Sequence, residues 1–443
     1  MTLDVFIPYM AVALTIALQG ITLIYLPPNS YRRICMFPVI LLLVAIVYFT
    51  AQNASVCGPW NLFIGVEFGS VLGFEVFDNV CLSKIAYSYA AVAEAGDRKK
   101  DDDIHAVSTW KHFYDKARWS LDRVINKRRI NRVDQTRHVP YFDSSRPHHT
   151  PSRRSFLLFR TMRCILLYLA LDLITSQPLE DAQVKFAPGK ERIFARIMAK
   201  DISPAEIGET FGMIMAHSIC GYSSLLVGYD LFSLVAVGLC NGHVSDWRPL
   251  FGDIRQVYTI RTFWRKFWHQ LLLRPLESNA SFIAHSILRL PRSTRSTARI
   301  ANAGSNGKDH TAQTQPQPQL QLQLQDKLLY IATIYTKLIL IFLISGIIHI
   351  NSDRILGIPF RDSHSISLFL CQAWGILFED AVQWMYRCVT GSKGNGPVKL
   401  WHRLVGYVWL VVFALWAAPA WIFSVLRLEL PPIVLPVTIF PRG

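Results

Sequence analysis

Long apolar runs, separated by polar and basic segments, dominate the pattern along this chain. A helix needs roughly 20 apolar residues to span the hydrocarbon core of a bilayer. The segments that meet or approach this length are Val5–Leu26, Ile34–Thr50, Trp60–Leu82, Phe156–Ile174, Phe211–Cys240, Leu328–Ile350, Ile366–Tyr386 and Leu404–Phe423. The fifth is long enough to be one tilted helix or two pieces broken near Gly221. We therefore predict an all-α, polytopic integral membrane protein with about eight transmembrane helices, within a range of roughly seven to nine.

The polar segments divide this single membrane domain into five parts. We predict N-terminal transmembrane helices in 1–82, a basic cytosolic loop in 83–155, central transmembrane helices in 156–240, a cytosolic or interfacial segment in 241–327, and C-terminal transmembrane helices in 328–443. Within the fourth part, Thr311–Gln325 is rich in Gln and Pro and predicts a flexible linker. The first apolar run follows Asp4 without a basic leader or a cleavage site, so we expect a retained span rather than a signal peptide.

The positive charge of the chain reports its topology. The formal net charge is +15, and the Lys and Arg residues concentrate in Ser83–Ser155, Asn241–Lys327 and Arg387–Arg403. Eight spans place these three segments on one side, which the positive-inside rule makes cytosolic, and both termini are then lumenal. Nucleic-acid binding is disfavoured because the charges lie between apolar runs. The sequon at Asn53 falls on the lumenal side, so we expect glycosylation there and residence in the endoplasmic reticulum membrane.

Composition excludes several classes of site. The chain has no P-loop, no GxGxxG, no GxSxG and no HExxH motif. Its eight cysteines contain no CxxC pair, so a structural zinc site and a disulfide framework are both disfavoured. We predict neither a bound metal ion nor a bound cofactor.

His349 is the first candidate for chemistry, because a histidine within an apolar span is uncommon and requires a polar neighbour or a wet cavity. Ser345 lies four residues earlier and shares one helix face with it. Gly346 allows another helix or a ligand to approach closely. One interpretation is a general base in a buried pocket, and the other is a histidine that is hydrogen-bonded at a helix end. Position alone leaves both open.

The second candidate is the segment Tyr258–Arg274. As one continuous helix it presents an apolar stripe of Phe263, Trp264, Phe267, Trp268, Leu271 and Leu272. On the opposite side or its border lie Arg261, Arg265, Lys266 and His269. Such a helix is typical of a membrane anchor at the interface. The alternative is a functional site, in which His269 lies beside cations that meet the phosphates of a ligand.

Other polar residues within the apolar runs support a competing class. They are Glu67, Glu75, Asp78, Asp172, His217, Asp230, Glu379 and Asp380. Any of them could line an ion path, which would make the chain a transporter or a channel. They form no repeated pattern, and no pair of broken helices is obvious, so this interpretation has weaker support. A non-catalytic membrane scaffold is a third possibility.

The two histidine segments together resemble a known family. Trp247-Arg-Pro-Leu-Phe-Gly-Asp253, then FWRKFWH ending at His269, then SGIIH ending at His349, resembles the wax-synthase-like branch of the membrane-bound O-acyltransferase superfamily. The resemblance covers residues 210–425. It implies a helical bundle with a buried tunnel, with His349 and His269 as the catalytic positions. Ile350 departs from the acidic residue that many members have after the histidine, and Asp353 is left open as a substitute partner.

Within that branch the chain looks most like fungal acetyltransferases of terpenoid or meroterpenoid biosynthesis. The resemblance implies acyl-CoA, acetyl-CoA in particular, as co-substrate, an apolar alcohol as acceptor and the lipid bilayer as environment. Residues expected to contact the substrates or CoA are Trp264, Arg265, Lys266, Trp268 and Ser345. A wax-ester synthase that uses long fatty acyl-CoA is the alternative within the same class, because the sequence does not give the width of the tunnel.

Overall fold

The chain folds into long helices, as its apolar runs predict. The structure is a computed structural model that describes residues 3–54, 58–87, 109–292, 317–391, 398–428, 435 and 437–440, and none of these residues forms a strand. The longer helices are α1 (Ile7–Tyr25), α2 (Tyr31–Thr50), α6 (Thr109–Ile125), α7 (Arg153–Ser176), α10 (Pro204–Gly238), α12 (Leu273–Phe282), α14 (Gln317–Leu356), α15 (Ser365–Thr390) and α16 (Leu400–Ala417). Shorter ones are α3 (Gly58–Phe63), α4 (Leu72–Val76), α8 (Ala182–Lys185), α9 (Ile193–Met198), α11 (Ile260–Thr262) and α17 (Pro419–Leu426).

Each predicted span contains helix, and within the described ranges seven helices are long and apolar enough to cross a membrane. The predicted span Phe156–Ile174 is the one outside this set. Its helix, α7, has 24 residues, which is sufficient length, but it carries Arg160, Arg163 and Asp172. The prediction of an all-α membrane protein with seven to nine spans is therefore confirmed, while the buried tunnel stays a prediction.

Three local expectations are corrected. Helix α10 continues through Gly221 as one helix of 35 residues, so the alternative of two broken pieces is wrong. The predicted span Leu404–Phe423 is divided into α16 and α17 at Pro419, because proline has no N–H to continue the helix and is favoured at a helix start. Residues 317–325 of the predicted linker form the first turns of α14, since Gln and Leu are good helix formers. Residues 311–316 lie outside the described residues.

The third span, residues 58–82, is widened by two π-helical segments, η3 (Ile64–Val71) and η4 (Phe77–Leu82). A π turn shifts backbone hydrogen bonds from i−4 to i−5 and is frequent at functional sites. Asn351 of α14 binds to the first of these segments. Its Nδ2 donates to the Gly65 carbonyl at 2.7 Å and to Ser70 Oγ at 2.9 Å. The third span is thereby attached to the helix that carries His349.

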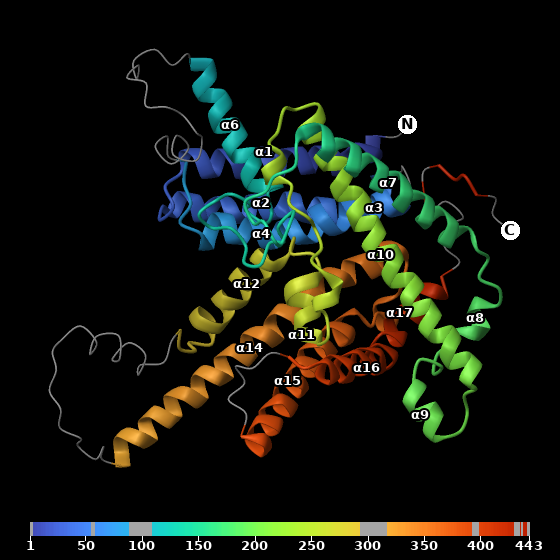
Figure 1. Cartoon of the computed structure of the whole chain (residues 1–443). Coiled ribbons are helices and arrows are strands. Elements are labelled where there is room, and N and C mark those ends of the chain that lie inside the picture. Colours follow the sequence, from blue (N-terminus) through green and yellow to red (C-terminus); the bar gives the residue numbers. More distant parts are fainter. Residues whose placement is uncertain are drawn as a thin grey trace.

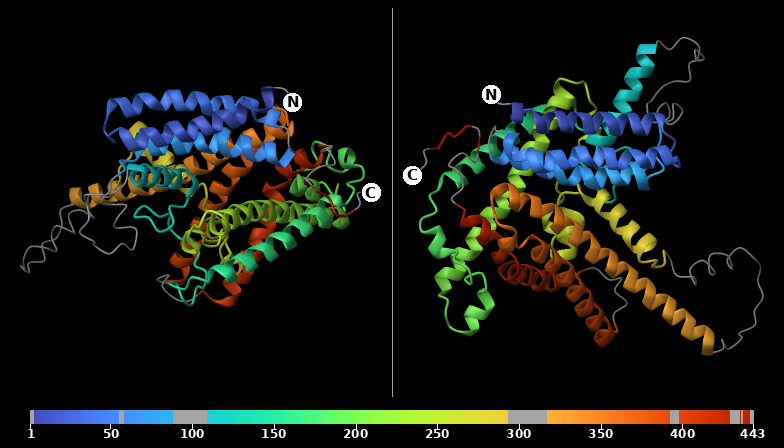
Figure 2. Two further views of the ribbon diagram at one scale, coloured as in Figure 1. Left: turned by 90° about the horizontal axis from the view of Figure 1, so that it is seen from above. Right: turned by 180° about the vertical axis from the view of Figure 1, so that it is seen from behind.

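The helices gather into three groups around α14. Helices α1 and α2 pack together and against the third span, and α14 lies across that layer and contacts η3 (Figure 1). Helices α7 and α10 pack along each other on a second side. Helix α15 packs along α14 on the third, with α16 and α17 beside it, and both views in Figure 2 keep this arrangement. His349 therefore lies on the central helix of the molecule.

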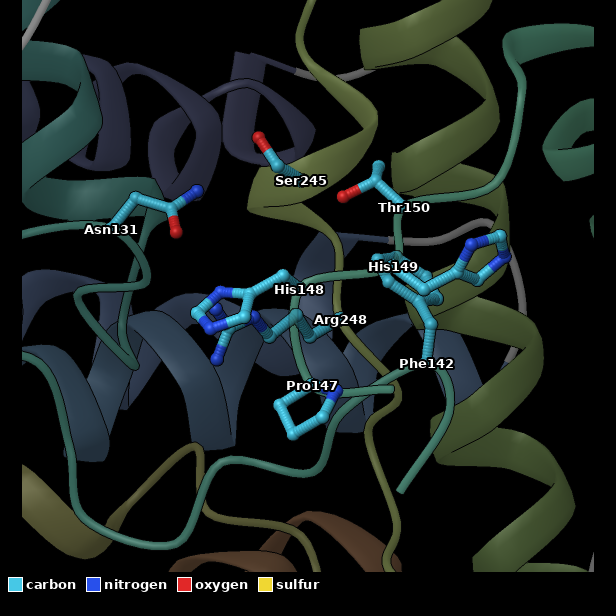
Figure 3. A pocket seen from close by; sticks show the side chains of 8 residues that line it. All are labelled: Asn131, Phe142, Pro147, His148, His149, Thr150, Ser245 and Arg248. Carbon is cyan, nitrogen blue, oxygen red and sulfur yellow. The ribbon is translucent and has the colours of Figure 1, made fainter. Parts of the chain in front are cut away.

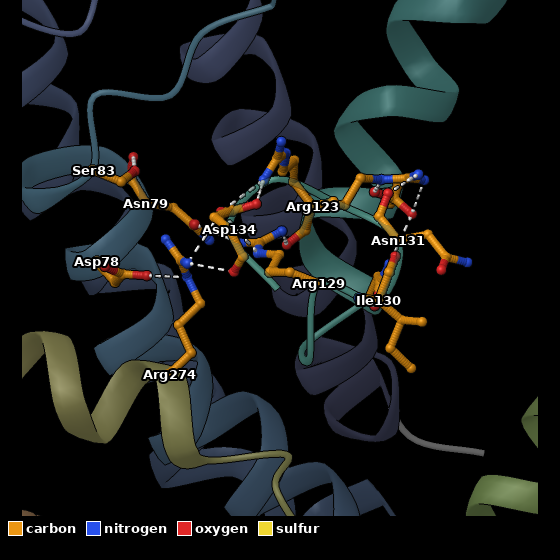
Figure 4. A network of polar contacts seen from close by, with 12 residues as sticks. Asp78, Asn79, Ser83, Arg123, Arg129, Ile130, Asn131, Asp134 and Arg274 are labelled. Carbon is orange, nitrogen blue, oxygen red and sulfur yellow. Dashed lines mark hydrogen bonds and ion pairs between the residues drawn. The ribbon is translucent and has the colours of Figure 1, made fainter. Parts of the chain in front are cut away.

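A network of buried and partly buried charges attaches the segment after α6 to the third span and to α12 (Figure 4). Arg274 of α12 donates to Asp78 Oδ2 at 2.9 Å and forms an ion pair with Asp134 at 3.0 Å. Lys127 pairs with Glu67 and, at 3.0 Å, with Glu75. The acidic residues of the third span, which the sequence left available for an ion path, thus pair with cations of α12 and of the segment after α6.

The other acidic residues within apolar runs also have partners. Asp230 of α10 pairs with Arg160 and, at 2.7 Å, with Arg163. Glu379 of α15 accepts the backbone N–H groups of Ile260 and Arg261, at 2.6 and 3.3 Å, and the Trp409 indole N–H. Two further contacts are those of Asp380 with Arg261 and of Asp172 Oδ2 with the backbone N–H of Ile439. Packing accounts for these carboxylates without an ion path.

Candidate active site

The imidazole of His349 has a defined tautomer. Its Nδ1 lies 2.7 Å from the carbonyl oxygen of Ser345, one turn earlier on α14. A carbonyl oxygen only accepts hydrogen bonds, so Nδ1 carries the hydrogen. In the neutral ring Nε2 then keeps its lone pair, which is the state a general base requires. Ser345, predicted to contact substrate, is buried and acts here through its backbone.

Close packing of α14 on α15 sets the position of this ring. The His349 ring lies 4.3 Å from the ring centroid of Phe369 on α15. Gly346 faces the α15 backbone so tightly that an added Cβ would come within 2.9 Å of the Ile366 Cα. The expectation that a small residue here lets another helix approach is confirmed. Phe369 also faces Trp264, with ring centroids 6.0 Å apart, so the second segment meets His349 across one aromatic wall.

Asp353, left open as a partner of His349, lies one turn further along α14 and is 1% exposed. Its carboxylate accepts hydrogen bonds from Ser363 Oγ at 2.6 Å, from Ser365 Oγ at 2.7 Å and from the Trp421 indole N–H at 2.9 Å. These three donors fix the position of the carboxylate near the histidine. The Asp353 carboxylate is thus bound by these three side chains, one helical turn from His349.

The segment Tyr258–Arg274 is not the continuous amphipathic helix that its pattern predicts. It begins as α11, passes into the π-helical segment η7 (Phe263–Phe267) and ends at Trp268, whose ψ of 151° is extended. The Phe267 carbonyl accepts the backbone N–H of Gly252 at 2.9 Å, so it belongs to a loop rather than to a next helical turn. His269 thus lies in the turn between η7 and α12, and not on a helix face.

The motif Trp247 to Asp253 wraps around this turn. Gly252 is required there, because an added Cβ would lie 1.9 Å from the carbonyl oxygen of Lys266. The ring of Phe251 lies 5.4 Å from that of Trp268 and 6.2 Å from that of His269. The two parts of the Trp-rich segment therefore fold into one aromatic cluster that encloses His269.

Successive ring contacts of Trp268, Trp264 and Phe369 connect His269 to His349. His269 keeps a little exposed surface, but its Nδ1 is buried and has no hydrogen-bond partner among the described residues. Burial, followed by the proximity of His349 and Arg128, lowers the pKa of His269 from 6.5 to about 3. His269 is therefore neutral at physiological pH, and one of its ring nitrogens is available to a group that enters the site.

Comparison with known sequences identifies the family of the chain. A profile of the Membrane bound O-acyl transferase family matches residues 247–304, which include the aromatic cluster and His269. The acetyltransferase ataH of Aspergillus terreus is 30% identical over 286 residues, which make up 63% of this chain and 81% of that protein. The chain belongs to the membrane-bound O-acyl transferase family. It is an acyltransferase that is similar to fungal proteins named as acetyltransferases.

Two further relatives extend the match of this membrane-bound O-acyltransferase. The acetyltransferase fsoF of Humicola fuscoatra is 31% identical over 298 residues, 65% of this chain and 62% of that protein. The acetyltransferase aurG of Calcarisporium arbuscula is 25% identical over 433 residues, 93% of this chain and 92% of that protein. This last match includes the N-terminal half, which the sequence resemblance left out. No solved structure matches the chain.

The residues of this acyltransferase predicted to bind its substrates fall into two sets. Trp264 and Trp268 lie in the aromatic cluster, and the Trp264 indole N–H donates to Gln372 Oε1 at 3.1 Å. Arg265 and Lys266 are exposed, and Arg265 Nε donates to His138 Nε2 at 2.9 Å. Trp264 and Trp268 therefore lie beside the two histidines. Arg265 and Lys266 face solvent, where they can bind only an anionic part of a ligand.

Several residues around the site of the acyltransferase could not be predicted from the sequence pattern. Phe369, Gln372 and Trp421 come from helices far from both motifs, and aromatic or amide residues are common in such helices. Phe251 had a signal, because it lies inside the Trp-rich motif. Asn53 is exposed at the end of the second span, but Ser55 of its sequon lies outside the described residues, so its glycosylation stays a prediction.

We expect acid to destabilise the fold through His269. The unfolded imidazole takes up a proton near its ordinary pKa and the folded one only near pH 3, so the unfolded state binds more protons between these values. Stability is then full above the unfolded pKa, and about 1–2 kcal/mol is lost between pH 7 and pH 5. Thermal unfolding in detergent at both pH values measures this loss. The variant His269→Asn, which does not titrate, should lose less, and an equal loss in both proteins would contradict the assignment.

Proposed function

We propose that this protein transfers an acetyl group from acetyl-CoA to the hydroxyl of an apolar alcohol, with His349 as the general base. The observation that carries the proposal is the hydrogen bond between His349 Nδ1 and the Ser345 carbonyl, which leaves the Nε2 lone pair free to accept a proton. Family membership supports acyl transfer, and the relatives named as acetyltransferases support acetyl as the group transferred.

The reaction requires one proton acceptor and one oxyanion stabiliser. Nε2 of His349 removes the hydroxyl proton while the alcohol oxygen attacks the thioester carbonyl, a role that typically contributes about 10²–10⁴-fold. The carbon–sulfur bond then breaks, and the proton passes from His349 to the departing CoA sulfur. The ester and free CoA are the products. The carboxylate of Asp353 would stabilise the imidazolium formed between these two steps.

His269 supplies the second role in this proposal. Because its pKa is about 3, its ring is neutral and donates a hydrogen bond without introducing a competing positive charge. Directed at the thioester carbonyl, that donor would stabilise the developing oxyanion. The unpartnered Nδ1 supports this role, since a buried nitrogen without a partner is costly unless a ligand group meets it.

The walls of the site support an apolar acceptor. Trp264, Phe342 and Phe369 form part of one hydrophobic cluster beside His349, with the rings of Trp264 and Phe342 5.6 Å apart. We propose a terpenoid or meroterpenoid alcohol of secondary metabolism, which reaches the site from the lipid bilayer, and residence of the enzyme in the endoplasmic reticulum membrane. The resemblance to fungal acetyltransferases supports this acceptor class.

An ester-formation assay tests the proposal. Microsomes that express the chain would receive labelled acetyl-CoA or palmitoyl-CoA with a panel of terpenoid and fatty alcohols. We expect labelled acetyl esters of terpenoid alcohols, at least tenfold above microsomes without the chain. Palmitoyl esters of fatty alcohols alone would replace the proposal with a wax-ester synthase. Absence of any ester with every pair would overturn acyl transfer to an alcohol.

A further inference from the structure

Arg128 connects the segment after α6 to the Trp-rich motif. Its side chain is 2% exposed, and its guanidinium donates to the Pro249 carbonyl at 2.6 Å and to the Arg248 carbonyl at 2.7 Å. The hydroxyl of Tyr229 on α10 accepts from the same guanidinium and donates to the Arg248 carbonyl at 2.8 Å. A buried cation with several hydrogen bonds fixes both chain segments. The surface between them is therefore preformed.

A pocket of about 140 Å³ lies on this surface, between residues 131–150 and the start of the motif. Six of its eight lining residues carry hydrogen-bond donors and none carries a carboxylate: Asn131, His148, His149, Thr150, Ser245 and Arg248. Figure 3 shows that they come from three chain segments, with the guanidinium of Arg248 beside the ring of His148. The volume accommodates a small, multiply charged anion.

The charges around the pocket favour an anion as well. Arg248 lies over the ring of Tyr141, 5.1 Å from its centroid, which orients the guanidinium without neutralising it. Two carboxylates of the flanking segments already have hydrogen-bond partners: Asp246 accepts from Asn131 Nδ2 at 2.8 Å, and Asp143 accepts from Arg146. Arg248 is thus a cation whose guanidinium is available to a ligand.

The pocket is also close to the candidate active site. Arg248 precedes Phe251 by three residues, and a chain extends by at most about 3.6 Å per residue, so their Cα atoms are within about 11 Å. The ring of Phe251 contacts that of His269. A ligand anchored in the pocket by one end can therefore reach the two histidines with a flexible arm.

We propose that this pocket binds a phosphate monoester. An arginine fork with several neutral donors matches the three terminal oxygens of such a group. Two sources carry this chemistry at a membrane surface. One is the 3′-phosphate of CoA, an assignment that rests on the proposed function, and the other is the headgroup of phosphatidic acid.

The first arm of the test measures binding of CoA and of 3′-dephospho-CoA to the purified full-length protein by calorimetry. We expect the wild type to bind CoA about tenfold more tightly or better. Arg248→Gln should remove this discrimination. Arg146→Gln is the matched control, because Arg146 is an exposed arginine of the segment 131–150 that does not line the pocket, and it should keep the discrimination. His148→Ala replaces Arg248→Gln if the latter fails to fold.

The second arm measures the thermal unfolding temperature in phosphatidylcholine nanodiscs with and without phosphatidic acid. A protective effect that Arg248→Gln loses and Arg146→Gln keeps would assign the phosphate to the lipid. If Arg248→Gln and Arg146→Gln behave alike in both arms, the pocket proposal is overturned. A wild type that binds neither form of CoA would overturn the proposed function instead, while the lipid arm would still decide the pocket.

Discussion

Replacing His349 with alanine is expected to remove acyl transfer while the protein stays folded. Loss of a general base typically costs about 10²–10⁴-fold in rate, and the proposed mechanism offers no second base placed at the hydroxyl. His349→Gln tests the same point with less change of shape, because its amide N–H can still donate to the Ser345 carbonyl while it lacks a basic nitrogen. Ester formation in microsomes, normalised to the amount of folded protein, measures both variants.

The control for this experiment is His243→Ala. His243 is exposed and precedes η5 (Val244–Asp246), outside the aromatic cluster, so its replacement should leave ester formation unchanged. Size-exclusion chromatography in detergent separates lost chemistry from lost folding. Retained acyl transfer in folded His349→Ala and His349→Gln would exclude His349 as the base and leave family membership untouched.

Replacing Asp230 with alanine is expected to produce the largest loss of stability. Asp230 is completely buried, and it neutralises Arg160, which is itself 2% exposed, and Arg163. Removal of one partner from a buried ion pair typically costs about 3–5 kcal/mol, because the remaining charge stays in a medium of low polarity. The same contacts hold α7 to α10, and Arg160 also donates to the Trp247 carbonyl at 2.7 Å. The damage should therefore reach the Trp-rich motif and reduce acyl transfer.

Unfolding in denaturant, followed in detergent, measures this loss. Asp201→Ala is the matched control: Asp201 also pairs with an arginine, Arg196, but its side chain is 77% exposed. An exposed pair contributes about 0–1 kcal/mol, so this variant should remain close to the wild type. Similar stabilities for Asp230→Ala and Asp201→Ala would show that the buried pair does not hold α7 to α10.

The apolar runs predicted the helices well because a membrane span is a local property of about 20 residues. Local sequence was insufficient where distant residues decide the structure. Arg128 lies in the basic segment 83–155, whose charge predicts topology, yet it is buried against Tyr229 and Pro249, which are about a hundred residues away. A charge pattern cannot distinguish a solvated arginine from one with distant carbonyl partners.

In the candidate site, too, some features were predictable from the sequence and others depended on distant residues. Resemblance to a family pointed to His349 and His269, which lie 80 residues apart, and successive ring contacts connect them in the fold. The helical periodicity around His269 was misleading, because the backbone N–H of Gly252 binds the Phe267 carbonyl and the chain turns at Trp268. The aromatic stripe that suggested a membrane anchor instead forms a cluster around His269.

Helix α14 is far longer than a bilayer core is thick. Its 40 residues make about 60 Å, against about 30 Å of hydrocarbon, so it tilts or extends into water. His349 lies seven residues before the end at Leu356, which is about 10 Å along the axis. Acyl transfer at that depth would take its alcohol from a single leaflet and release the ester into the same leaflet.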